Sequence, residues 1–481
     1  MKKTTNADEV MRLFKQLNAI PRPSHHEERV ADFLCDYAQR LGLEYKRDSQ
    51  NCVVIRKPAT PGHEDATPIV LLNHMDMVCV GMEHPTEDPI EAYVEDGWMK
   101  ARGTSLGADN GIGLSMALAV LADDTITHGP LEVITTTNEE DGMSGAANLS
   151  ADFLHGRKVI NLDSEDYDTI TTGAAGACLQ FHRIPLKRQP APGGKRRWLR
   201  ISINGGKGGH SGVDINKGRA SATVIAWAVL AAIYNEYDFL VSSIRVGEAN
   251  ASIASSAEIV MTIPSGEPAA FAKAQQESLN EWIRQEYGDG DADPDMHCTI
   301  EKTEPQETVI NPEAFEALMR ALEQTPQGVV KMSETMQDTV ETSNNVGRIT
   351  TEDDHIFVST HTRSFIDQDM AALADDIKKV FATEGATTEL VMLAPAWQEN
   401  QDSDFLRLVS DTFDDVLGWR PRKVAMHFVL EAGYFVEKYP GIEIASIGPR
   451  IVEPHSALER VELSTITDIW RVLLTLLERL S

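Results

Sequence analysis

Apolar residues recur along the chain in two spacings, which separate its expected helices from its expected strands. Apolar side chains at helical spacing predict a first helix that begins at Ser24 and stops at Gly42, with Ser24 and Glu27 as an S-x-x-E capping box. A second helical run covers residues 112–121. Short apolar runs predict buried strands at residues 69–72, 131–134 and 159–162. Strands that alternate with helices predict an α/β layer with a mostly parallel sheet flanked by helices.

The composition of the sequence changes near residue 185. Residues 184–198 are rich in proline, glycine and basic side chains, as in a linker or exposed hairpin. Beyond it the pattern predicts strands at 199–203, 257–263 and 356–363, and helices at 220–234, 267–287 and 370–382. The α/β pattern then returns, with a strand at 442–447 and a closing helix at 464–480. We therefore expect an α/β domain made of residues 1–184 and 391–481, interrupted by an α+β domain of residues 185–390.

Length and charge narrow the class of protein. The chain has 481 residues, too many for one compact core, so two domains are expected. It carries 44 Lys and Arg against 74 Asp and Glu, a net charge of −30. Such an acidic protein repels a phosphate backbone, which argues against nucleic acid as a partner. Most of the acidic excess is typical of a soluble surface, and some of it is available for metal ligands.

Cysteine usage points to a reducing compartment. The number of cysteines is odd and no Cys-x-x-Cys pair occurs, which argues against a disulfide framework and against a thiolate zinc site; the five are Cys35, Cys52, Cys79, Cys178 and Cys298. Residues 1–6 have no apolar run behind them, so no signal peptide is expected. No apolar stretch is long enough to span a membrane. We expect a cytoplasmic protein.

Acidic and imidazole side chains follow the predicted strands at the point where each strand ends. In open α/β sheets this edge is where ligands bind. Carboxylate and imidazole without thiolate suit zinc, manganese or cobalt. The residues in question are His74, Asp76, Glu139, Glu140 and Asp163, with Asp109 at the start of the helical run 112–121.

Each of these residues also has an ordinary structural interpretation. His74 could be a hydrogen-bonded strand end, Asp109 a turn former, Glu139 and Glu140 a solvated loop, and Asp163 a helix cap. Any one of these residues could follow a strand by chance. It is much less expected by chance that all of them lie at the same edge of the sheet. The spacing alone therefore favours a metal site without settling it.

Six segments resemble the signature blocks of the bacterial aminoacyl-histidine dipeptidases. These enzymes belong to the co-catalytic zinc peptidases, which also include aminoacylases and glutamate carboxypeptidases. The block at 101–111, Ala-Arg-Gly-Thr-Ser-Leu-Gly-Ala-Asp-Asn-Gly, is highly specific to this branch. The others follow in family order and run through most of the chain: 74–76, 139–142, 161–163, 208–212 and 454–456.

The resemblance implies two divalent metal ions, zinc with manganese or cobalt as alternatives. Asp109 would bridge them, His74 and Asp163 would complete one site, and Glu140 and His455 the other. Two cations about 3.5–4 Å apart need a shared anionic ligand to offset their repulsion, and a water held between them becomes a nucleophile near neutral pH.

The resemblance also assigns the residues around the metals. Glu139 would act as general base on the water, and Asp76 would orient His74. The Asp109–Asn110 peptide bond is often cis in the family, an isomer that is costly outside proline.

Further residues would hold the substrate. The segment 205–212 lacks the G-x-x-x-x-G-K-[ST] spacing of a phosphate loop. The resemblance instead makes His210 an oxyanion-stabilising residue of a lid and dimerisation domain, which reaches the partner's active site in dimeric relatives. Arg363 would pair with the substrate carboxylate. Asn250 and Asn345 would lie near the substrate.

Each of these substrate residues has an alternative. His210 could be an incidental histidine in a glycine-rich turn, and Arg363 could form a surface ion pair. Asn250 and Asn345 could be ordinary turn asparagines. Glu431 matches a Leu-Glu-x-Gly element, but Phe428 and Val429 before it depart from the expected Ala-Gly, which puts the pocket shape in doubt.

The expected reaction is metal-dependent hydrolysis of a dipeptide with a free carboxylate, either aminoacyl-histidine or of broad specificity. The expected partners are a small peptide substrate and a second copy of the chain in a homodimer, with neither nucleic acid nor membrane. One alternative is an N-acyl amino acid deacylase of the same chemistry. The other is a non-catalytic peptide-binding relative, against which stands the expected residue at every catalytic position.

Overall fold

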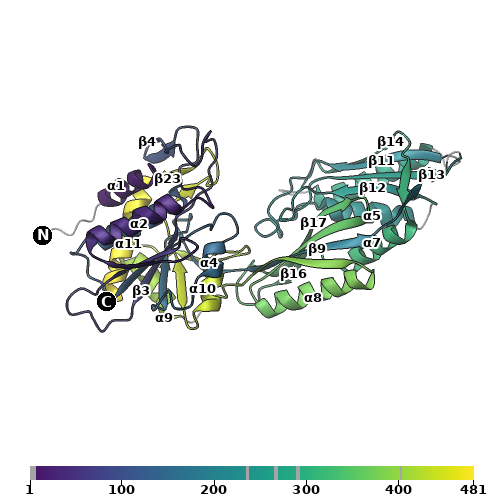
Figure 1. The fold of residues 1–481 in the computed structure, drawn as a ribbon. Helices are drawn as coiled ribbons and strands as arrows, with labels where there is room; N and C mark the ends of the chain where they lie inside the picture. The colour runs from purple at the N-terminus through teal and green to yellow at the C-terminus, as the bar shows by residue number, and fades with distance from the viewer. Residues whose placement is uncertain (1–6, 195, 235–237, 265–268, 289–292, 401–402) are drawn as a thin grey trace. The chain divides into compact units, whose positions relative to one another are not determined.

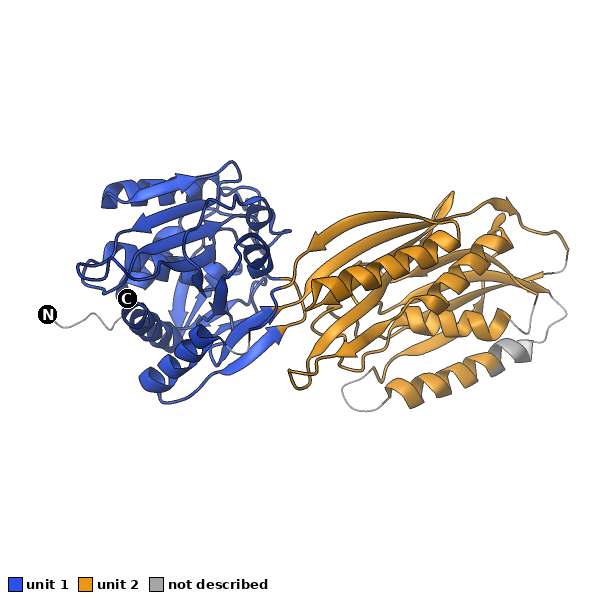
Figure 2. Cartoon of the chain, turned by 90° about the horizontal axis from the view of Figure 1, so that it is seen from below, with its two compact units in different colours: residues 1–173, 397–425, 430–481 blue, residues 174–396, 426–429 orange. Residues whose placement is uncertain are grey.

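The computed structural model describes residues 7–481 except 195, 235–237, 265–268, 289–292 and 401–402. Residues 1–6, where no signal peptide is expected, lie outside the described residues. The chain folds into two compact units (Figure 2): unit 1 comprises residues 1–173, 397–425 and 430–481, and unit 2 comprises residues 174–396 and 426–429.

Unit 1 is built on an eight-stranded sheet (Figure 1). In sheet order its strands are β1 (Glu44–Arg47), β2 (Val53–Lys57), β6 (Leu131–Thr136), β3 (Ile69–His74), β7 (Lys158–Asn161), β21 (Glu443–Ser446), β8 (Thr169–Ala174) and β20 (Arg422–Met426). The four central strands β6, β3, β7 and β21 run parallel, whereas β1, β2 and β8 pair antiparallel with their neighbours. The ends of β6, β3 and β7 therefore share one edge.

A smaller sheet and the helices complete unit 1. The sheet has the order β22 (Ile451–Val452), β23 (Arg460–Glu462), β5 (Trp98–Ala101) and β4 (Ala92–Glu95). The helices are α1 (Asp8–Leu17), α2 (Glu28–Leu41), α3 (Ala108–Ala122), α4 (Ser144–Asn148), α9 (Asp404–Leu417), α10 (Ala432–Lys438) and α11 (Leu463–Arg479).

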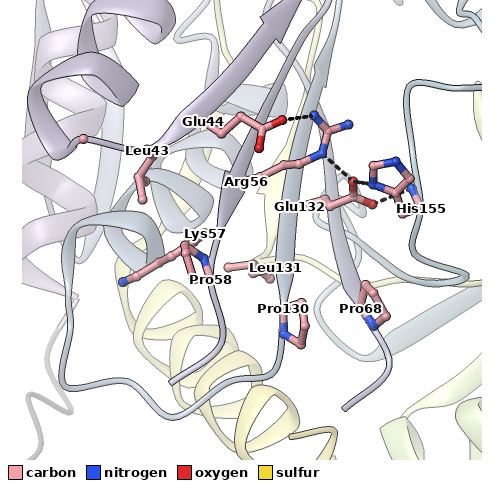
Figure 3. A pocket seen from close by; sticks show the side chains of 11 residues that line it. Leu43, Glu44, Arg56, Lys57, Pro58, Pro68, Pro130, Leu131, Glu132 and His155 are labelled. Atoms are coloured by element: carbon pink, nitrogen blue, oxygen red, sulfur yellow. Dashed lines mark hydrogen bonds and ion pairs between the residues drawn. The ribbon is translucent and has the colours of Figure 1, made fainter. Parts of the chain in front are cut away.

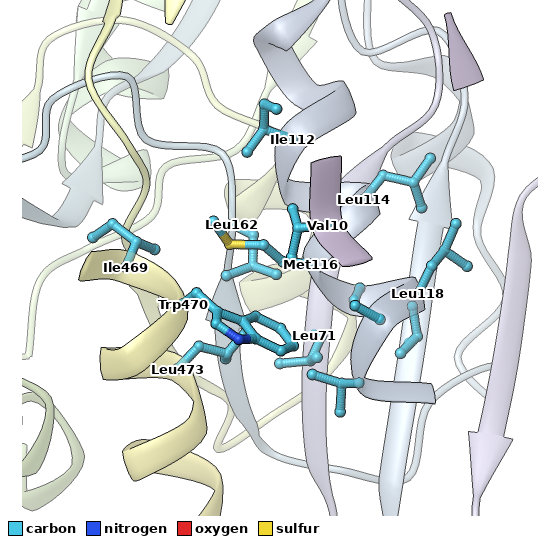
Figure 4. Close-up of a cluster of buried hydrophobic side chains, with 14 of the residues drawn as sticks. Val10, Leu71, Ile112, Leu114, Met116, Leu118, Leu162, Ile469, Trp470 and Leu473 are labelled. Carbon is cyan, nitrogen blue, oxygen red and sulfur yellow. The ribbon is translucent and has the colours of Figure 1, made fainter. Parts of the chain in front are cut away.

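The core of unit 1 explains why apolar runs predicted its elements. All six residues of β3 are buried, as a strand covered on both faces requires. Helix α3 is buried nearly all round, so it packs inside the unit. Figure 4 shows Met116 of α3, Trp470 of α11 and Leu71 of β3 in this cluster, each fully or almost fully buried.

The capping-box prediction at Ser24 was wrong. Helix α2 begins at Glu28, and the Ser24 hydroxyl donates instead to Asp76 Oδ2 at 2.8 Å. The Glu27 carboxylate accepts from the backbone N–H of Asn138 at 2.9 Å. Both side chains therefore form hydrogen bonds with the loops that follow the strands, and neither caps the helix. The predicted stop is confirmed, since Gly42 caps α2 with a left-handed φ of 68°.

Unit 2 is a nine-stranded antiparallel sheet with helices. Its order is β14 (His297–Lys302), β11 (Arg196–Asn204), β13 (Ala257–Pro264), β12 (Leu240–Val246), β17 (Val340–Thr351), β18 (His355–Ser364), β9 (Gly176–Pro185) and β19 (Thr387–Ala394), and β16 (Gly328–Met332) also pairs with β17. A separate pair joins β10 (Arg188–Pro190) and β15 (Thr308–Ile310). The helices are α5 (Ala222–Tyr234), α6 (Ala269–Tyr287), α7 (Pro312–Gln324) and α8 (Asp367–Thr383).

The expected fold class is confirmed: an α/β unit, parallel at its centre, is interrupted by an α+β unit. The expected domain limits differ from the compact units. The limit at 184/185 falls within β9, which pairs with β18 along its whole length, and the limit at 390/391 falls within β19. The proline-rich segment lies between strands inside unit 2, because proline and glycine mark a loop without telling which kind of connection it makes. No helix in the described part of the chain is long and apolar enough to cross a membrane.

Candidate metal centre

The carboxyl edge of the unit 1 sheet collects the polar residues that follow its strands. His74 is the last residue of β3, Glu139 and Glu140 follow β6, and Asp163 follows β7. Asp109 lies at the start of α3. His455 comes from the loop between β22 and β23, far along the chain. Parallel strands bring their carboxyl ends to one side, and these residues meet there.

Asp109 lies between two sets of side chains, one at each of its carboxylate oxygens. Oδ1 lies 3.1 Å from His74 Nε2, which is 3.2 Å from Asp163 Oδ1. Oδ2 lies 3.1 Å from His455 Nε2, which is 2.8 Å from Glu140 Oε2. The peptide bond between Asp109 and Asn110 is cis. Each oxygen of the Asp109 carboxylate thus lies next to a separate pair of one imidazole and one carboxylate.

These distances fit a pair of divalent cations. Ligand atoms about 2.0–2.1 Å from a tetrahedral zinc stand roughly 3.3 Å from one another. Two groups of ligand atoms within 4.8 Å occur among the described residues and share Asp109: one adds His74 and Glu140, the other Glu165 and His455. All the donors are carboxylates or imidazoles, which suit zinc, manganese or cobalt.

The electrostatics of the centre favour positive charge. Hydrogen bonds to Asp109 and Glu140 raise the pKa of His455 to about 11. Burial opposes a charged His74, yet Asp163, Asp109 and Asp76 together raise its pKa well above the usual value. Burial also raises the pKa of Asp163 to about 6, against the attraction of His74. Crowded carboxylates of this kind attract cations strongly.

Asp76 organises the loop that carries Glu139 and Glu140. It is fully buried, and its oxygens accept from the backbone N–H groups of Glu139 at 3.0 Å and Glu140 at 3.2 Å. Its Oδ1 stands 3.5 Å from His74 Nδ1, longer than a hydrogen bond. The Asp76 carboxylate, which also accepts from the Ser24 hydroxyl, therefore fixes the Glu139–Glu140 backbone, a role that the sequence did not indicate.

The Glu139 side chain belongs to neither group of ligand atoms. Burial raises the pKa of Glu139 well above its usual value, against His74, and the carboxylates of Asp163, Glu431 and Glu140 add to the rise. Glu431 is itself buried, with a pKa of about 8, and accepts from Thr136 Oγ1 at 2.7 Å. A carboxylate with a raised pKa is suited to take up a proton near neutral pH.

Two buried charged residues that the sequence did not single out hold this edge together. The carboxylate of Glu459 accepts from the backbone N–H groups of Leu106 at 2.7 Å, Gly107 at 2.9 Å and Ala108 at 2.7 Å, just before Asp109. Arg22 donates to the carbonyl of Gly107 at 2.6 Å and to those of Met75 and Asp76. Neither lies in a recognisable motif, so only the fold reveals them.

His210 and Arg363 lie in unit 2. His210 Nδ1 accepts from the backbone N–H groups of Gly212 at 3.2 Å and Val213 at 3.1 Å, so the proton of the neutral ring is on Nε2. Burial and the charge of Arg363 lower the pKa of His210 to about 4. Arg363 is 3% exposed and donates to Ser211 Oγ at 3.3 Å. His210 is therefore a neutral hydrogen-bond donor beside a buried cation.

The two asparagines of unit 2 differ. Asn345 is fully buried; it donates to the carbonyl of Ser252 at 2.8 Å and accepts from Gln327. Both ends of its side-chain amide are thus engaged in hydrogen bonds within the protein. The Oδ1 atom of Asn250 is buried without a hydrogen-bond partner among the described residues. The described contacts bring neither asparagine side chain to His210 or Arg363.

A hollow of about 430 Å³ lies at the opposite ends of the same strands, where β3 and β6 begin (Figure 3). Its charged side chains are paired: Arg56 contacts Glu44 and Glu132, and His155 contacts Glu132 (Figure 3). Lys57, which also lines the hollow, pairs with Asp124 at 3.3 Å. These charges are satisfied within the protein. The chemistry of unit 1 therefore concentrates at the carboxyl edge.

Known proteins resemble this chain along its full length. The chain is 34% identical over 480 residues to the cytosol non-specific dipeptidase of Escherichia coli, which covers 97% of this chain and 96% of that protein. The crystal structure of aminoacylhistidine dipeptidase from Vibrio alginolyticus matches with a TM-score of 0.90 at 34% identity, over 98% of this chain and 96% of that one. Aminopeptidase PepT from Bacillus cereus shares the fold, with a TM-score of 0.62 at 18% identity over 99% of both chains.

The match to a protein family covers the polar edge of unit 1, the whole of unit 2 and the His455 loop. The family description "Peptidase family M20/M25/M40" matches residues 70–479. This range includes His74, Asp109, Glu140, Asp163 and His455. The chain belongs to peptidase family M20/M25/M40.

Proposed function

We propose that this peptidase is a metal-dependent dipeptidase that uses two divalent cations, zinc in the first place and manganese or cobalt as alternatives. The observation that carries the proposal is the position of Asp109, whose two oxygens each face a separate pair of imidazole and carboxylate. A shared carboxylate is what two neighbouring cations need. The names of the two relatives at 34% identity, both dipeptidases, support the substrate class.

The proposed ligands are Asp109 for both ions, His74 and Asp163 for one, and Glu140 and His455 for the other. The bound ions would supply Lewis-acid activation of the water and of the scissile carbonyl. Glu139 takes a proton from the attacking water and delivers it to the leaving amine. Asp76 positions Glu139 by accepting from its backbone N–H at 3.0 Å. This last contact adds a task for Asp76 to its expected role beside His74.

Unit 1 is the proposed catalytic unit, and unit 2 the proposed lid that binds the substrate. The Nε2–H group of His210 would donate to the oxyanion of the tetrahedral intermediate, as its tautomer allows. Arg363 would receive the terminal carboxylate of the peptide. Asn250, with its free buried Oδ1, would accept a hydrogen bond from the substrate.

Metal removal and a substrate panel test the function together. The purified chain is expected to contain about two zinc, manganese or cobalt ions and to cleave unblocked dipeptides, aminoacyl-histidine among them. N-acetyl amino acids should be cleaved far more slowly than dipeptides. An N-acyl amino acid deacylase would show the opposite preference. Dialysis against a chelator should abolish cleavage, and added zinc should restore it. A chain that cleaves only N-acetyl amino acids, or that loses no activity without metal, contradicts the proposal.

We also propose that the chain is a cytoplasmic homodimer. The five cysteines are all free, and the E. coli relative is named a cytosolic enzyme. Edge strand β19 of unit 2 exposes Leu390, Val391 and Leu393, an apolar edge of the kind that soluble proteins usually cover. Light scattering during size-exclusion chromatography should give a mass near twice 53.0 kDa. A mass of one chain at micromolar concentration contradicts the dimer.

A further inference from the structure

Strand β18 of unit 2 presents two residues of interest on the same face. His361 and Arg363 are two positions apart, and alternate residues of a strand share a face. Their partners on β17 are Asn345 and Ser343. Around Arg363 we define the Arg363 recess as the five buried residues Ser211, Ser343, His361, Arg363 and His427.

Arg363 is a buried cation without a recorded anion. It is 3% exposed, and its side chain donates to Ser211 Oγ. Its Nε atom has no hydrogen-bond partner in the part of the chain that the structure describes. No carboxylate of the described residues forms an ion pair with it. Burial alone lowers the pKa of Arg363, to about 10, so it remains charged at neutral pH. An uncompensated buried charge is strongly destabilising, which indicates that an anion from outside completes this site.

His361 is buried with neither ring nitrogen in a hydrogen bond to a described residue, although it is only 4% exposed. Burial, with the charge of Arg363, lowers its pKa well below the usual value, so the ring is neutral and offers one N–H donor. A buried donor without a partner is destabilising. Such a group is expected where a ligand supplies the missing acceptor.

His182 shows what a structural histidine looks like in the same sheet. Its two ring nitrogens contact the hydroxyls of Thr388 and Thr360, both at 2.9 Å, and the ring stacks on Phe381. Thr360 neighbours His361 in β18, so His182 lies on the opposite face of the sheet. Both ring nitrogens of His182 have partners, whereas neither ring nitrogen of His361 has one among the described residues. Burial in this sheet therefore does not by itself explain an unpartnered ring.

The rest of the recess offers no carboxylate. His427 Nε2 contacts Ser343 Oγ at 2.8 Å, and burial lowers the pKa of His427 to about 3. Gly212 lets the loop of Ser211 pack closely here, since a Cβ at this position would lie 2.1 Å from the carbonyl oxygen of His427. One guanidinium and two neutral imidazoles thus line a closely packed recess.

We propose that His361 is a specificity-determining residue that donates its ring N–H to the terminal carboxylate of the peptide, alongside Arg363. The proposal rests on the proposed dipeptidase function and names how the substrate's C-terminus is selected. Alternate residues on a strand lie about 7 Å apart, so one carboxylate can accept from both side chains. A C-terminal amide would bring an N–H group toward the guanidinium and lose most of this interaction.

The test compares two uncleavable ligands: a dipeptide whose peptide bond is replaced by a methyleneamine, with either a free carboxylate or a C-terminal amide. Their dissociation constants are measured by calorimetry on the zinc-loaded full chain. His361→Leu should weaken binding of the acid by about 10- to 100-fold, the effect of a lost hydrogen bond to a charged group, and that of the amide by less than about threefold. His361→Gln, which keeps an N–H donor, should recover most of the loss.

His182→Leu is the matched control, since it makes the same change in the same sheet and should alter neither dissociation constant. Equal weakening of acid and amide by His361→Leu, or no weakening of either, overturns the proposal. If thermal melting shows that His361→Leu does not fold, His361→Ala replaces it with the same expectation, because it also removes the N–H donor.

The two proposals fail in different ways. A chain that cleaves no dipeptide but binds the acid more tightly than the amide through His361 keeps the carboxylate role and loses the dipeptidase function. A chain that cleaves dipeptides while His361→Leu binds the acid as tightly as wild type keeps the function and loses the carboxylate role.

Discussion

Replacement of Glu139 by glutamine is expected to lower kcat by about 10²- to 10⁴-fold, the usual contribution of a general base, while the metal content stays close to that of wild type. Glutamine has almost the same shape but cannot accept the proton of the attacking water. The Glu139 side chain belongs to neither group of metal-ligand atoms, so its loss should leave both ions in place. Its backbone N–H bond to Asp76 is unaffected by the change.

The measurements are kcat on a dipeptide that wild type cleaves and metal content by mass spectrometry on the same samples. Asp141→Asn is the matched control, because Asp141 lies in the same loop and is exposed, and its side chain pairs with that of His25 at 2.9 Å. It removes one carboxylate near the centre and should leave kcat within about twofold of wild type. Undiminished turnover by Glu139→Gln would refute the assignment of the base, and loss of metal would instead make Glu139 a ligand.

The sequence predicted the central sheet of unit 1 well, for a physical reason. Strands covered on both faces are mostly apolar, so β3, β6 and β7 stand out as short apolar runs, interrupted in β6 by the buried Glu132. Polar residues directly after such runs lie at the ligand-binding edge of the sheet. His74 and Asp163 could be placed there from pattern alone, whereas His455 came only from the family resemblance, because its loop follows no central strand.

The residues that hold the centre in place could not be predicted in this way. Glu459 accepts from the backbone N–H groups of four consecutive residues about 350 positions earlier in the chain, and Arg22 donates to carbonyls of two separate loops. Such contacts depend on tertiary structure and leave no local spacing. The capping box at Ser24 failed for the same reason, since tertiary contacts of Ser24 and Glu27 outweighed the local cap.

Unit 2 was predicted less completely. Its strands are antiparallel, and polar residues interrupt their apolar pattern, as in β17, whose residues 340–347 are all buried although most of them are polar. Strand β18 was expected, but nothing in the sequence distinguishes His361 from a structural histidine such as His182. The difference is the hydrogen-bond partners of each ring, which only the folded sheet reveals.

Replacement of Asp109 by asparagine is expected to remove at least one of the two metal ions and to lower kcat/KM by more than about 10³-fold. Asparagine keeps one oxygen but turns the other position into an N–H₂ group, which cannot bind a cation. Both oxygens of Asp109 are in use, one facing His74 and the other His455. The loss of the bridging charge also leaves the two cations to repel each other.

Metal content and zinc affinity are the direct measurements, and kcat/KM follows on the same protein. Asp166→Asn is the control: Asp166 is exposed, lies near Asp163 in the chain, and loses the same charge without facing either imidazole. It should bind two ions as wild type does. If Asp109→Asn also keeps two ions at wild-type affinity, the shared carboxylate is not what holds them, and the centre must be built from other ligands. If it keeps one ion and loses activity, the bridging position is the one that the reaction requires, since the surviving His–carboxylate pair cannot act alone.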